Sequence, residues 1–187
     1  MPMPRLALHG RPGAGKSTFA ALLLEELRAA GATSKRIKVG APLYEIQAVV
    51  RAAAGRPLLG ADEQDGRLLN LLGAEMRRIN PTALTDTFAA RVREAEQRFP
   101  DAVLICDDVR APDADSVVEL GFRLLQITAR DEVRRTRKAL RGDLSAGDEA
   151  HSTEGSLAVA PWRCIVNDGD LAALRGQARA LVAEEIR

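Results

Sequence analysis

Short apolar runs alternate along this chain with longer stretches in which apolar residues recur every three or four positions. The first pattern is typical of buried strands and the second of amphipathic helices. Apolar runs predict strands at residues 6–9, 37–39, 102–106, 123–128 and 164–166. Helical spacing predicts helices at residues 17–30, 43–54, 62–79, 82–99, 130–141 and from 171 onward. This alternation predicts a three-layer α/β/α fold around a mostly parallel sheet of about five strands.

Two of the predicted helices have an apolar stripe that we expect to face the core. The stripe of the helix at 17–30 consists of Phe19, Leu22, Leu23 and Leu27. The stripe of the helix at 62–79 consists of Leu69, Leu72, Met76 and Ile79. At the last helix, Asp170 stands where an N-capping side chain is expected.

The composition is that of an ordinary globular protein. Hydrophobic residues make up 46% of the 187 positions, which fits one domain over residues 1–187. The formal net charge of +1 gives no basic field for nucleic acid or an anionic membrane, and no apolar stretch is long enough to span a membrane. We therefore expect a cytoplasmic protein without nucleic-acid or membrane partners. Cys106 and Cys164 lack metal-site spacing, which favours reduced cysteines in the core.

A glycine-rich segment follows the first predicted strand and opens the first predicted helix. It reads Gly10-Arg11-Pro12-Gly13-Ala14-Gly15-Lys16-Ser17 and matches the phosphate-loop pattern G-x-x-x-x-G-K-[ST]. In such a loop, main-chain N–H groups surround the phosphates and the helix N-terminus adds its positive end. We expect Gly13 to Thr18 to line the site, with Lys16 on the β- and γ-phosphates and the Ser17 hydroxyl on Mg²⁺. The segment predicts binding of ATP with Mg²⁺.

Two adjacent carboxylates end the most strand-like run of the chain. Asp107 and Asp108 follow residues 102–106, and the strands of an open α/β sheet present their carboxyl ends to one crevice. An acid at this position holds the magnesium shell in phosphate-loop proteins, so both are candidate metal ligands. An aspartate pair after a strand is also common turn chemistry. Neighbours on a strand point to opposite faces, so the spacing leaves open which of the two serves magnesium.

The helix predicted at 130–141 is strongly basic. Its arginines recur on one face: Arg130, Arg134, Arg137 and Arg141. A Gly-bounded segment at 142–147 follows, and together these features predict a lid over residues 130–154. Its guanidinium groups, with Arg130 and Arg134 as catalytic candidates, would stabilise a transferring phosphoryl group; the alternative is an ordinary solvated face. Elsewhere, Arg78 and Arg110 are candidates to bind a second phosphate.

Five further blocks occur in order over nearly the whole chain. They are residues 40–43 (GAPL), 69–78 (LNLLGAEMRR), 107–113 (DDVRAPD), 151–154 (HSTE) and 165–174 (IVNDGDLAAL). In this order they resemble the signatures A-x-P-L-K, L-Q-x-x-G-x-E-x-x-R, DVRFPNE, H-x-S-E and I-x-N-D-G-x-L-x-x-L of the bacteriophage-type deoxynucleoside monophosphate kinases.

The resemblance implies an adenylate-kinase-like P-loop fold that transfers the γ-phosphoryl group of ATP to a deoxynucleoside monophosphate. It implies that residues 40–100 supply the acceptor-binding helices, that Arg78 and Arg110 contact the monophosphate, and that Asp108 is the signature acid. It also implies that Asn167 and Gly169 lie near the adenine of ATP. The chain departs from the family pattern at four positions, of which Tyr44, a candidate acceptor-binding residue, replaces a lysine. The others are Ala111, Ala114 and Thr153, and the base specificity stays open.

The sequence thus predicts ATP-dependent phosphorylation of a (deoxy)nucleoside monophosphate by in-line transfer, in a monomer or homodimer whose partners are small-molecule nucleotides. An acceptor phosphate oxygen is already anionic, so this reaction needs no general base. A kinase acting on a nucleoside or another small-molecule alcohol does need one, and Asp107 or Asp108 would serve. A P-loop switch or ATPase without a small-molecule acceptor is a third interpretation, although neither a DxxG turn after Asp108 nor an NKxD motif occurs.

Overall fold

The computed structural model describes residues 4–60, 65–140 and 159–185. Within these ranges the chain forms five strands: β1 (Arg5–His9), β2 (Ser34–Arg36), β3 (Val103–Cys106), β4 (Arg123–Thr128) and β5 (Arg163–Val166). The helices are α1 (Lys16–Ala29), α2 (Ala41–Ala53), α3 (Gly66–Ile79), α4 (Ala83–Arg98), α5 (Ala114–Glu119), α6 (Asp131–Ala139) and α7 (Leu171–Glu185), with the short 3₁₀ helix η1 (Ala111–Asp113) before α5. None of these helices is long and apolar enough to cross a membrane.

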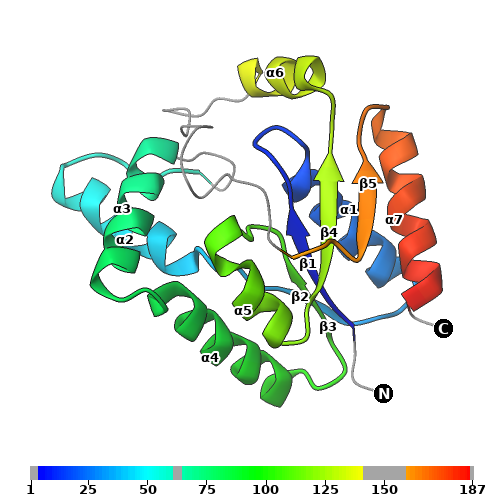
Figure 1. Ribbon diagram of the computed structural model, residues 1–187, viewed down its shortest axis with the longest axis horizontal. Helices are drawn as coiled ribbons and strands as arrows, with labels where there is room; N and C mark the ends of the chain where they lie inside the picture. Colours follow the sequence, from blue (N-terminus) through cyan, green and yellow to red (C-terminus); the bar gives the residue numbers. More distant parts are fainter. Residues whose placement is uncertain (1–3, 61–64, 141–158, 186–187) are drawn as a thin grey trace.

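All neighbouring strands in the sheet are parallel, in the order β2-β3-β1-β4-β5 (Figure 1). The central strand is β1, whose Ala7 pairs with Cys106 of β3 and with Leu124 of β4. Strands buried on both faces need apolar side chains at consecutive positions, which explains the unbroken apolar runs. Because the strands run in one direction, the carboxyl ends of β1 and β3 meet at the upper edge of the sheet in Figure 1.

Helices cover both faces of the sheet and divide the core into two clusters. On one face, α1 and α7 pack against the strands through side chains such as Phe19 and Leu181. On the other face, α4 and α5 cover the strands, and Phe88 of α4 packs on Phe122 with ring centroids 5.4 Å apart. Helices α2 and α3 pack on each other and extend outward beside this second face (Figure 1).

The predicted fold class is confirmed: a parallel five-stranded sheet lies between two layers of helices. The second strand is β2 at Ser34–Arg36, three residues before the predicted 37–39. Ile37 and Val39 are buried but lie beyond the strand, although the N–H of Ile37 still donates to the carbonyl oxygen of Ile105 on β3 at 2.8 Å. Helix α3 begins at Gly66 rather than at residue 62, and neither η1 nor α5 was predicted. The assignment of residues 1–187 to one domain stays a prediction.

The predicted buried faces are confirmed in part. The apolar stripe of α1 is buried along its whole length. The predicted stripe of α3 is wrong at Ile79, whose side chain is 74% exposed. The face of α3 that packs on α2 instead contains the buried Gly73, where Leu43 of α2 comes close. Cys164 is exposed, so only Cys106 is a core cysteine. Asp170 caps α7 as predicted, accepting a hydrogen bond from the N–H of Ala173 at 2.8 Å.

Candidate active site

The phosphate loop predicted at residues 10–17 connects β1 to α1. Gly13 and Gly15 have φ angles of +80° and +98°, a region that residues with a side chain rarely adopt. Position 10 requires glycine because there is no room for a side chain: a Cβ there would lie 2.2 Å from the carbonyl oxygen of Ile127 on β4. The three glycines therefore permit a tight turn at the end of the central strand, as a phosphate-binding loop requires.

The loop's cation, Lys16, occupies the first position of α1. Its Nζ donates to the carbonyl oxygens of Gly10 at 2.5 Å and of Arg11 at 3.5 Å. These acceptors belong to the loop itself, so the ammonium group lies at the loop and not in the core. Ser17 and Thr18 follow in the first turn of α1 and are exposed. An ammonium group, two hydroxyls and the positive end of a helix form a combination that suits a phosphate anion.

Side chains from two later segments bind the back of the loop. Nη1 of Arg134 on α6 donates to the carbonyl oxygen of Pro12 at 2.9 Å. Nδ2 of Asn167, which directly follows β5, donates to the carbonyl oxygen of Ala14 at 2.8 Å. Arg137 of α6 in turn donates to the main-chain oxygen and to Oδ1 of Asn167, at 3.0 and 3.3 Å. The structure therefore places Asn167 behind the phosphate loop.

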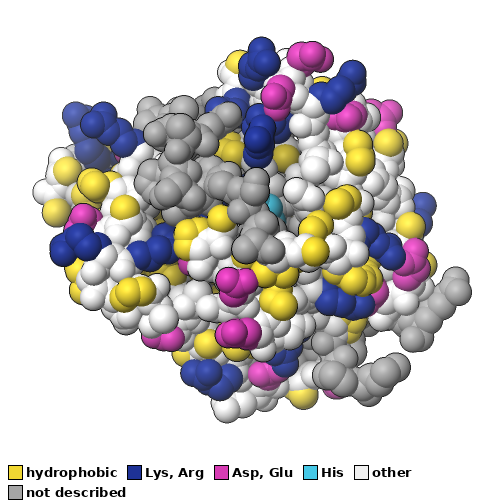
Figure 2. All heavy atoms as spheres, in the orientation of Figure 1, with side chains coloured by type: hydrophobic (Ala, Val, Ile, Leu, Met, Phe, Trp, Pro, Cys, Tyr) yellow, Lys and Arg dark blue, Asp and Glu magenta, His cyan; other side chains and the backbone are white. Residues whose placement is uncertain are grey.

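We expected Arg130 and Arg134 to belong to a lid, and the structure gives Arg134 different contacts. Its side chain is only 6% exposed, and besides the loop it binds Asp131, whose pKa it holds below the ordinary value. Arg130 is exposed, and its main-chain N–H donates to Asp168 at 2.7 Å. Figure 2 shows Lys and Arg side chains interspersed with Asp and Glu side chains over α6. Residues 141–154 of the predicted lid lie outside the described residues, so the catalytic roles of Arg130 and Arg134 stay predictions.

The two carboxylates after β3 have different partners. Asp107 is buried and binds the Arg36 guanidinium with both oxygens, Nε donating to Oδ1 at 2.8 Å and Nη2 to Oδ2. Asp108 accepts the N–H groups of Val39 and Gly40, each at 2.9 Å. Burial raises the pKa of Asp108, which the two N–H groups oppose and the charge of Asp107 reinforces.

These contacts bear on the magnesium site. Within the described ranges, no three His, Cys, Asp or Glu side chains cluster as metal ligands. A nucleotide-bound Mg²⁺ needs few protein ligands, because phosphates and water supply most of its six oxygens. The Ser17 hydroxyl fits that requirement, whereas Asp107 would have to share its oxygens with Arg36. The metal roles of Ser17, Asp107 and Asp108 stay predictions.

Tyr44, on the first turns of α2, lies close to the end of β3. Burial and the charge of Asp108 raise the pKa of its hydroxyl, and the charge of Arg110 opposes the shift. A Cβ at Gly40 would lie 3.0 Å from Oδ2 of Asp108 and 3.8 Å from Cε2 of Tyr44, so these two side chains flank Gly40. Nζ of Lys38 lies 4.8 Å from the centre of the Tyr44 ring. The roles of Tyr44 and Arg110 in binding an acceptor stay predictions.

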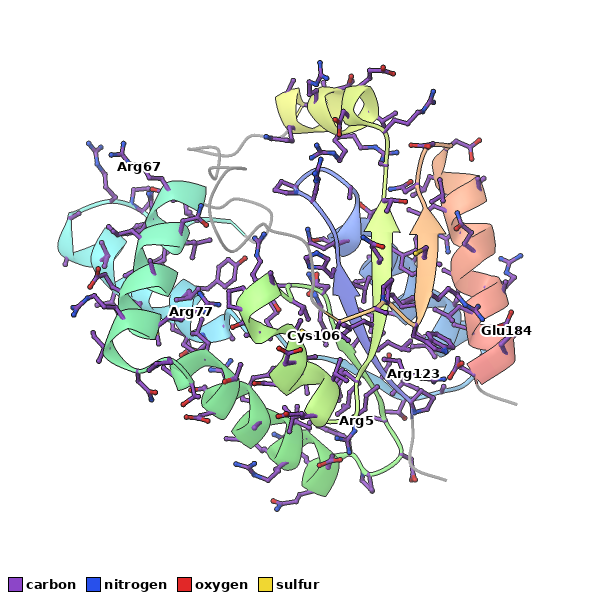
Figure 3. The ribbon with its side chains drawn as sticks, in the orientation of Figure 1. Arg5, Arg67, Arg77, Cys106, Arg123 and Glu184 are labelled. Carbon is purple, nitrogen blue, oxygen red and sulfur yellow. The ribbon has the colours of Figure 1, made fainter. Side chains whose placement is uncertain are left out.

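The structure separates Arg78 from its neighbour Arg77. The Arg78 side chain is 69% exposed and binds Glu75 at 2.8 Å. Arg77 instead reaches from α3 toward η1 and binds both oxygens of the buried Asp113, at 2.9 and 2.7 Å (Figure 3). Sequence reasoning missed Arg77. The available signal was its spacing of four residues from the buried Gly73, which places both on one face of α3.

The two groups of residues lie at the same edge of the sheet. The pairing of Ala7 with Cys106 aligns the ends of β1 and β3. Beyond the strands, Nδ1 of the buried His9 lies 3.2 Å from the carbonyl oxygen of Val109. The segment entering the phosphate loop is thus in contact with the segment that contains Asp108 and Arg110.

Solved structures with a similar fold include several kinases. The unliganded sugar kinase from Janibacter sp. HTCC2649 is 18% identical, with a TM-score of 0.57 over 99% of this chain and 95% of that one. The APS kinase of Mycobacterium tuberculosis, in complex with AMPPNP and APS, is 13% identical, with a TM-score of 0.56 over 97% and 96%. The shikimate kinase of Acinetobacter baumannii, in complex with shikimate, is 13% identical, with a TM-score of 0.54 over 98% and 93%.

These likenesses show that the chain has the fold of P-loop kinases. No model of a known protein family matches the sequence, and no curated protein matches it. The chain therefore shares the fold of these kinases, and its predicted phosphate loop connects β1 to α1.

Proposed function

We propose that the protein is an ATP-dependent phosphotransferase that converts a (deoxy)nucleoside monophosphate to the diphosphate. The observation that carries the proposal is the contact between two groups of residues at one edge of the sheet. One is the phosphate loop after β1; the other is the cluster of Tyr44, Asp108 and Arg110 near the end of β3. Two substrates held side by side need little further ordering to react, which is a major part of kinase catalysis.

The phosphate loop supplies the donor site in this proposal. The Lys16 ammonium would exchange the Gly10 carbonyl oxygen for the β- and γ-phosphates of ATP, while residues 13–18 present main-chain N–H groups. The Ser17 hydroxyl would join a magnesium ion whose charge offsets that of the phosphates. The presence of AMPPNP, an ATP analogue, in the similarly folded APS kinase supports this assignment.

Cations around Tyr44 supply the acceptor site. Arg110 would bind the acceptor's phosphate, Lys38 would add positive charge, and the Tyr44 phenol, kept protonated by its raised pKa, would donate a hydrogen bond. Arg78, which the family resemblance implies as a second phosphate ligand, would have to leave Glu75 to reach it. The attacking phosphate oxygen is already anionic, so Asp108 can remain bound to two main-chain N–H groups.

A second candidate is a kinase that phosphorylates a small-molecule alcohol. The similarly folded sugar kinase and shikimate kinase favour it. One observation in this chain favours it as well: burial raises the pKa of Asp108, which makes its carboxylate a better base for a hydroxyl proton. The two candidates share the donor site and differ in the nature of the acceptor.

A panel of acceptors distinguishes them. ATP-dependent ADP release would be measured with each nucleoside and deoxynucleoside monophosphate, with the matching nucleosides, and with small alcohols such as sugars and shikimate. Phosphorus NMR of the products would then show whether a phosphoanhydride or a phosphate ester has formed. A phosphoanhydride from any monophosphate supports the proposal. Turnover of nucleosides or alcohols alone, with ester products, would overturn it in favour of the second candidate, and ATP hydrolysis without a phosphorylated product would exclude both.

A further inference from the structure

We infer that Asn167 and Arg134 are positioning residues that hold the phosphate loop in its binding shape, and that Arg137 keeps Asn167 in place. The inference rests on the proposed function in one respect, the binding of a triphosphate at this loop. It assigns Asn167 to the phosphates, through the loop, rather than to the adenine base. It also assigns Arg134 to the loop rather than to the moving part of a lid.

The orientation of the loop's peptide groups explains why its carbonyl oxygens need partners. A phosphate loop turns its N–H groups inward, which leaves carbonyl oxygens on the outside. Carbonyl oxygens in a buried setting need hydrogen-bond donors. Arg134 donates to the oxygen of Pro12, and Asn167 donates to the oxygen of Ala14. These two carbonyls flank Gly13, whose φ is +80°, so the donors act on either side of a residue with a left-handed backbone.

The fit between the loop and its backing residues leaves space for glycine only. A Cβ at Gly15 would lie 2.2 Å from Nδ2 of Asn167. A Cβ at Gly13 would lie 2.8 Å from the main-chain oxygen of Arg134 and 3.1 Å from Cγ of Lys138. The glycines at positions 13 and 15 therefore meet two requirements, a positive φ and close contact with the segments behind the loop.

Arg137 determines which way the Asn167 amide faces. An arginine side chain can only donate hydrogen bonds, so it binds Oδ1 of Asn167 and leaves Nδ2 directed at Ala14. The main chain of Asn167 is held as well, since its N–H donates to Thr128 and its oxygen accepts from Arg137. Asn167 is 4% exposed. Both polar atoms of its amide are thus engaged within the protein, and its orientation is fixed by a guanidinium group from α6.

The experiment measures binding by calorimetry with three Mg²⁺-loaded probes: ATP, GTP and inorganic tripolyphosphate. The variants Asn167→Ala and Arg134→Gln should weaken the binding of all three by a similar factor, about tenfold or more, because each loses a hydrogen bond that shapes the phosphate site. An Asn167 that reads the base would instead change the ratio of ATP to GTP affinity and leave tripolyphosphate binding unchanged. That result would overturn the inference.

Two controls accompany the measurement. Arg135→Gln removes an exposed arginine next to Arg134 on α6 and should bind all three probes like the wild type. Arg134→Lys retains one donor for the Pro12 oxygen and should recover part of the lost affinity.

Thermal unfolding of each variant separates loss of binding from loss of fold. Should Asn167→Ala melt below the assay temperature, Arg134→Gln and Arg137→Gln carry the test, and unaltered tripolyphosphate affinity in both would overturn the inference. A wild type that binds neither ATP nor tripolyphosphate would overturn the donor site itself, and with it the proposed function.

Discussion

The region proposed to bind the donor and the region proposed to bind the acceptor are held together by different kinds of contact. Around the phosphate loop, side chains of α6 and of the segment after β5 bind main-chain oxygens of the loop. Around the acceptor region, Asp108 binds main-chain N–H groups, but two further carboxylates bind side chains: Asp107 pairs with Arg36, and Asp113 pairs with Arg77. The first region depends mainly on backbone shape and the second on pairs of opposite charges.

Because of this difference, the two regions should respond differently to substitutions. A loop bound through its main chain has a shape set by its glycines and by the side chains that bind its carbonyl oxygens, so changes to these residues should weaken recognition of the phosphates. A region built from buried ion pairs loses stability when one partner is removed, because the other is left as an unpaired buried charge. Substitutions should therefore affect function first in the donor region and stability first in the acceptor region.

The largest effect is expected for Lys16→Ala in the donor region. The Lys16 ammonium contacts loop carbonyls and not the core, so the fold should persist. Transfer should fall by about 10³-fold, the size seen when a preorganised charge is removed from a transition state. Steady-state kinetics with the best acceptor would be compared with a thermal unfolding curve. Near-normal turnover in a folded variant would refute the assignment of the phosphate loop.

The next effect concerns stability in the acceptor region. Arg77→Ala would leave the Asp113 carboxylate, which is 3% exposed, without its guanidinium partner. It should lower the free energy of unfolding by about 3 kcal/mol. Arg78→Ala removes an exposed pair with Glu75 and should change it by less than about 0.5 kcal/mol. Urea unfolding gives both values.

Removing both charges supplies the control for this pair of variants. Arg77→Ala combined with Asp113→Ala leaves no unpaired carboxylate and should be less destabilising than Arg77→Ala alone. Equal stability losses for Arg77→Ala and Arg78→Ala would show that α3 is rotated about its axis, so that Arg77 does not face Asp113. An acceptor KM raised by Arg78→Ala would support the role that the family resemblance implies for Arg78.

A third effect contrasts two glycines that share a positive φ. Gly15→Ala introduces backbone strain at φ +98° and a contact 2.2 Å from Asn167, and the affinity for ATP should fall about tenfold to a hundredfold. Gly31→Ala has strain at φ +78° but open space around it, so it should cost about 1–2 kcal/mol of stability without altering ATP affinity. Equal ATP affinity in the two variants would contradict the close contact between the loop and Asn167.

The smallest effect is a pH dependence in the acceptor region. Tyr44 is the sole tyrosine of the chain, so tyrosinate absorbance reports its ionisation directly. Burial raises its pKa above the ordinary value of 10.0, and the folded protein should titrate at higher pH than the unfolded chain. Between the two values the folded state binds the extra proton, so stability should fall as pH rises through that window.

Arg110 provides a check on this titration. Its charge lowers the pKa of Tyr44 and so opposes the effect of burial. Arg110→Gln should therefore move the absorbance midpoint further upward. A midpoint that stays at its wild-type value in Arg110→Gln would show that Arg110 and Tyr44 do not share one site.

The donor region was largely predictable from the sequence because its residues are contiguous. The glycine spacing, Lys16 and Ser17 lie within one segment that also connects a strand to a helix. The backing residues were not predictable, since Asn167 binds an oxygen 153 positions earlier in the chain. Nothing in the local pattern around α6 distinguishes an arginine that binds the loop from one that faces solvent.

The acceptor region was predictable only in part, for a related reason. Asp107 and Arg36 are 71 positions apart, and Asp113 and Arg77 are 36 positions apart, so no spacing rule connects them. The sequence presented each as a charged residue that is normally exposed. Burial turns them into pairs that stabilise the fold, and this depends on the sheet order and on the rotation of α3, which only the structure supplies.

The parallel pairing of β1 with β3 has a consequence for ligand design. Because the pairing of Leu6 and Ala7 with β3 fixes the register of the two strands, the segments that follow them, which contain the phosphate loop and Arg110, begin at fixed positions relative to each other. A single molecule that joins adenosine to the acceptor's nucleoside through a chain of phosphates should therefore have one optimal chain length. Compounds one phosphate shorter or longer should bind more weakly, so the strand register would determine which length of bisubstrate inhibitor binds best.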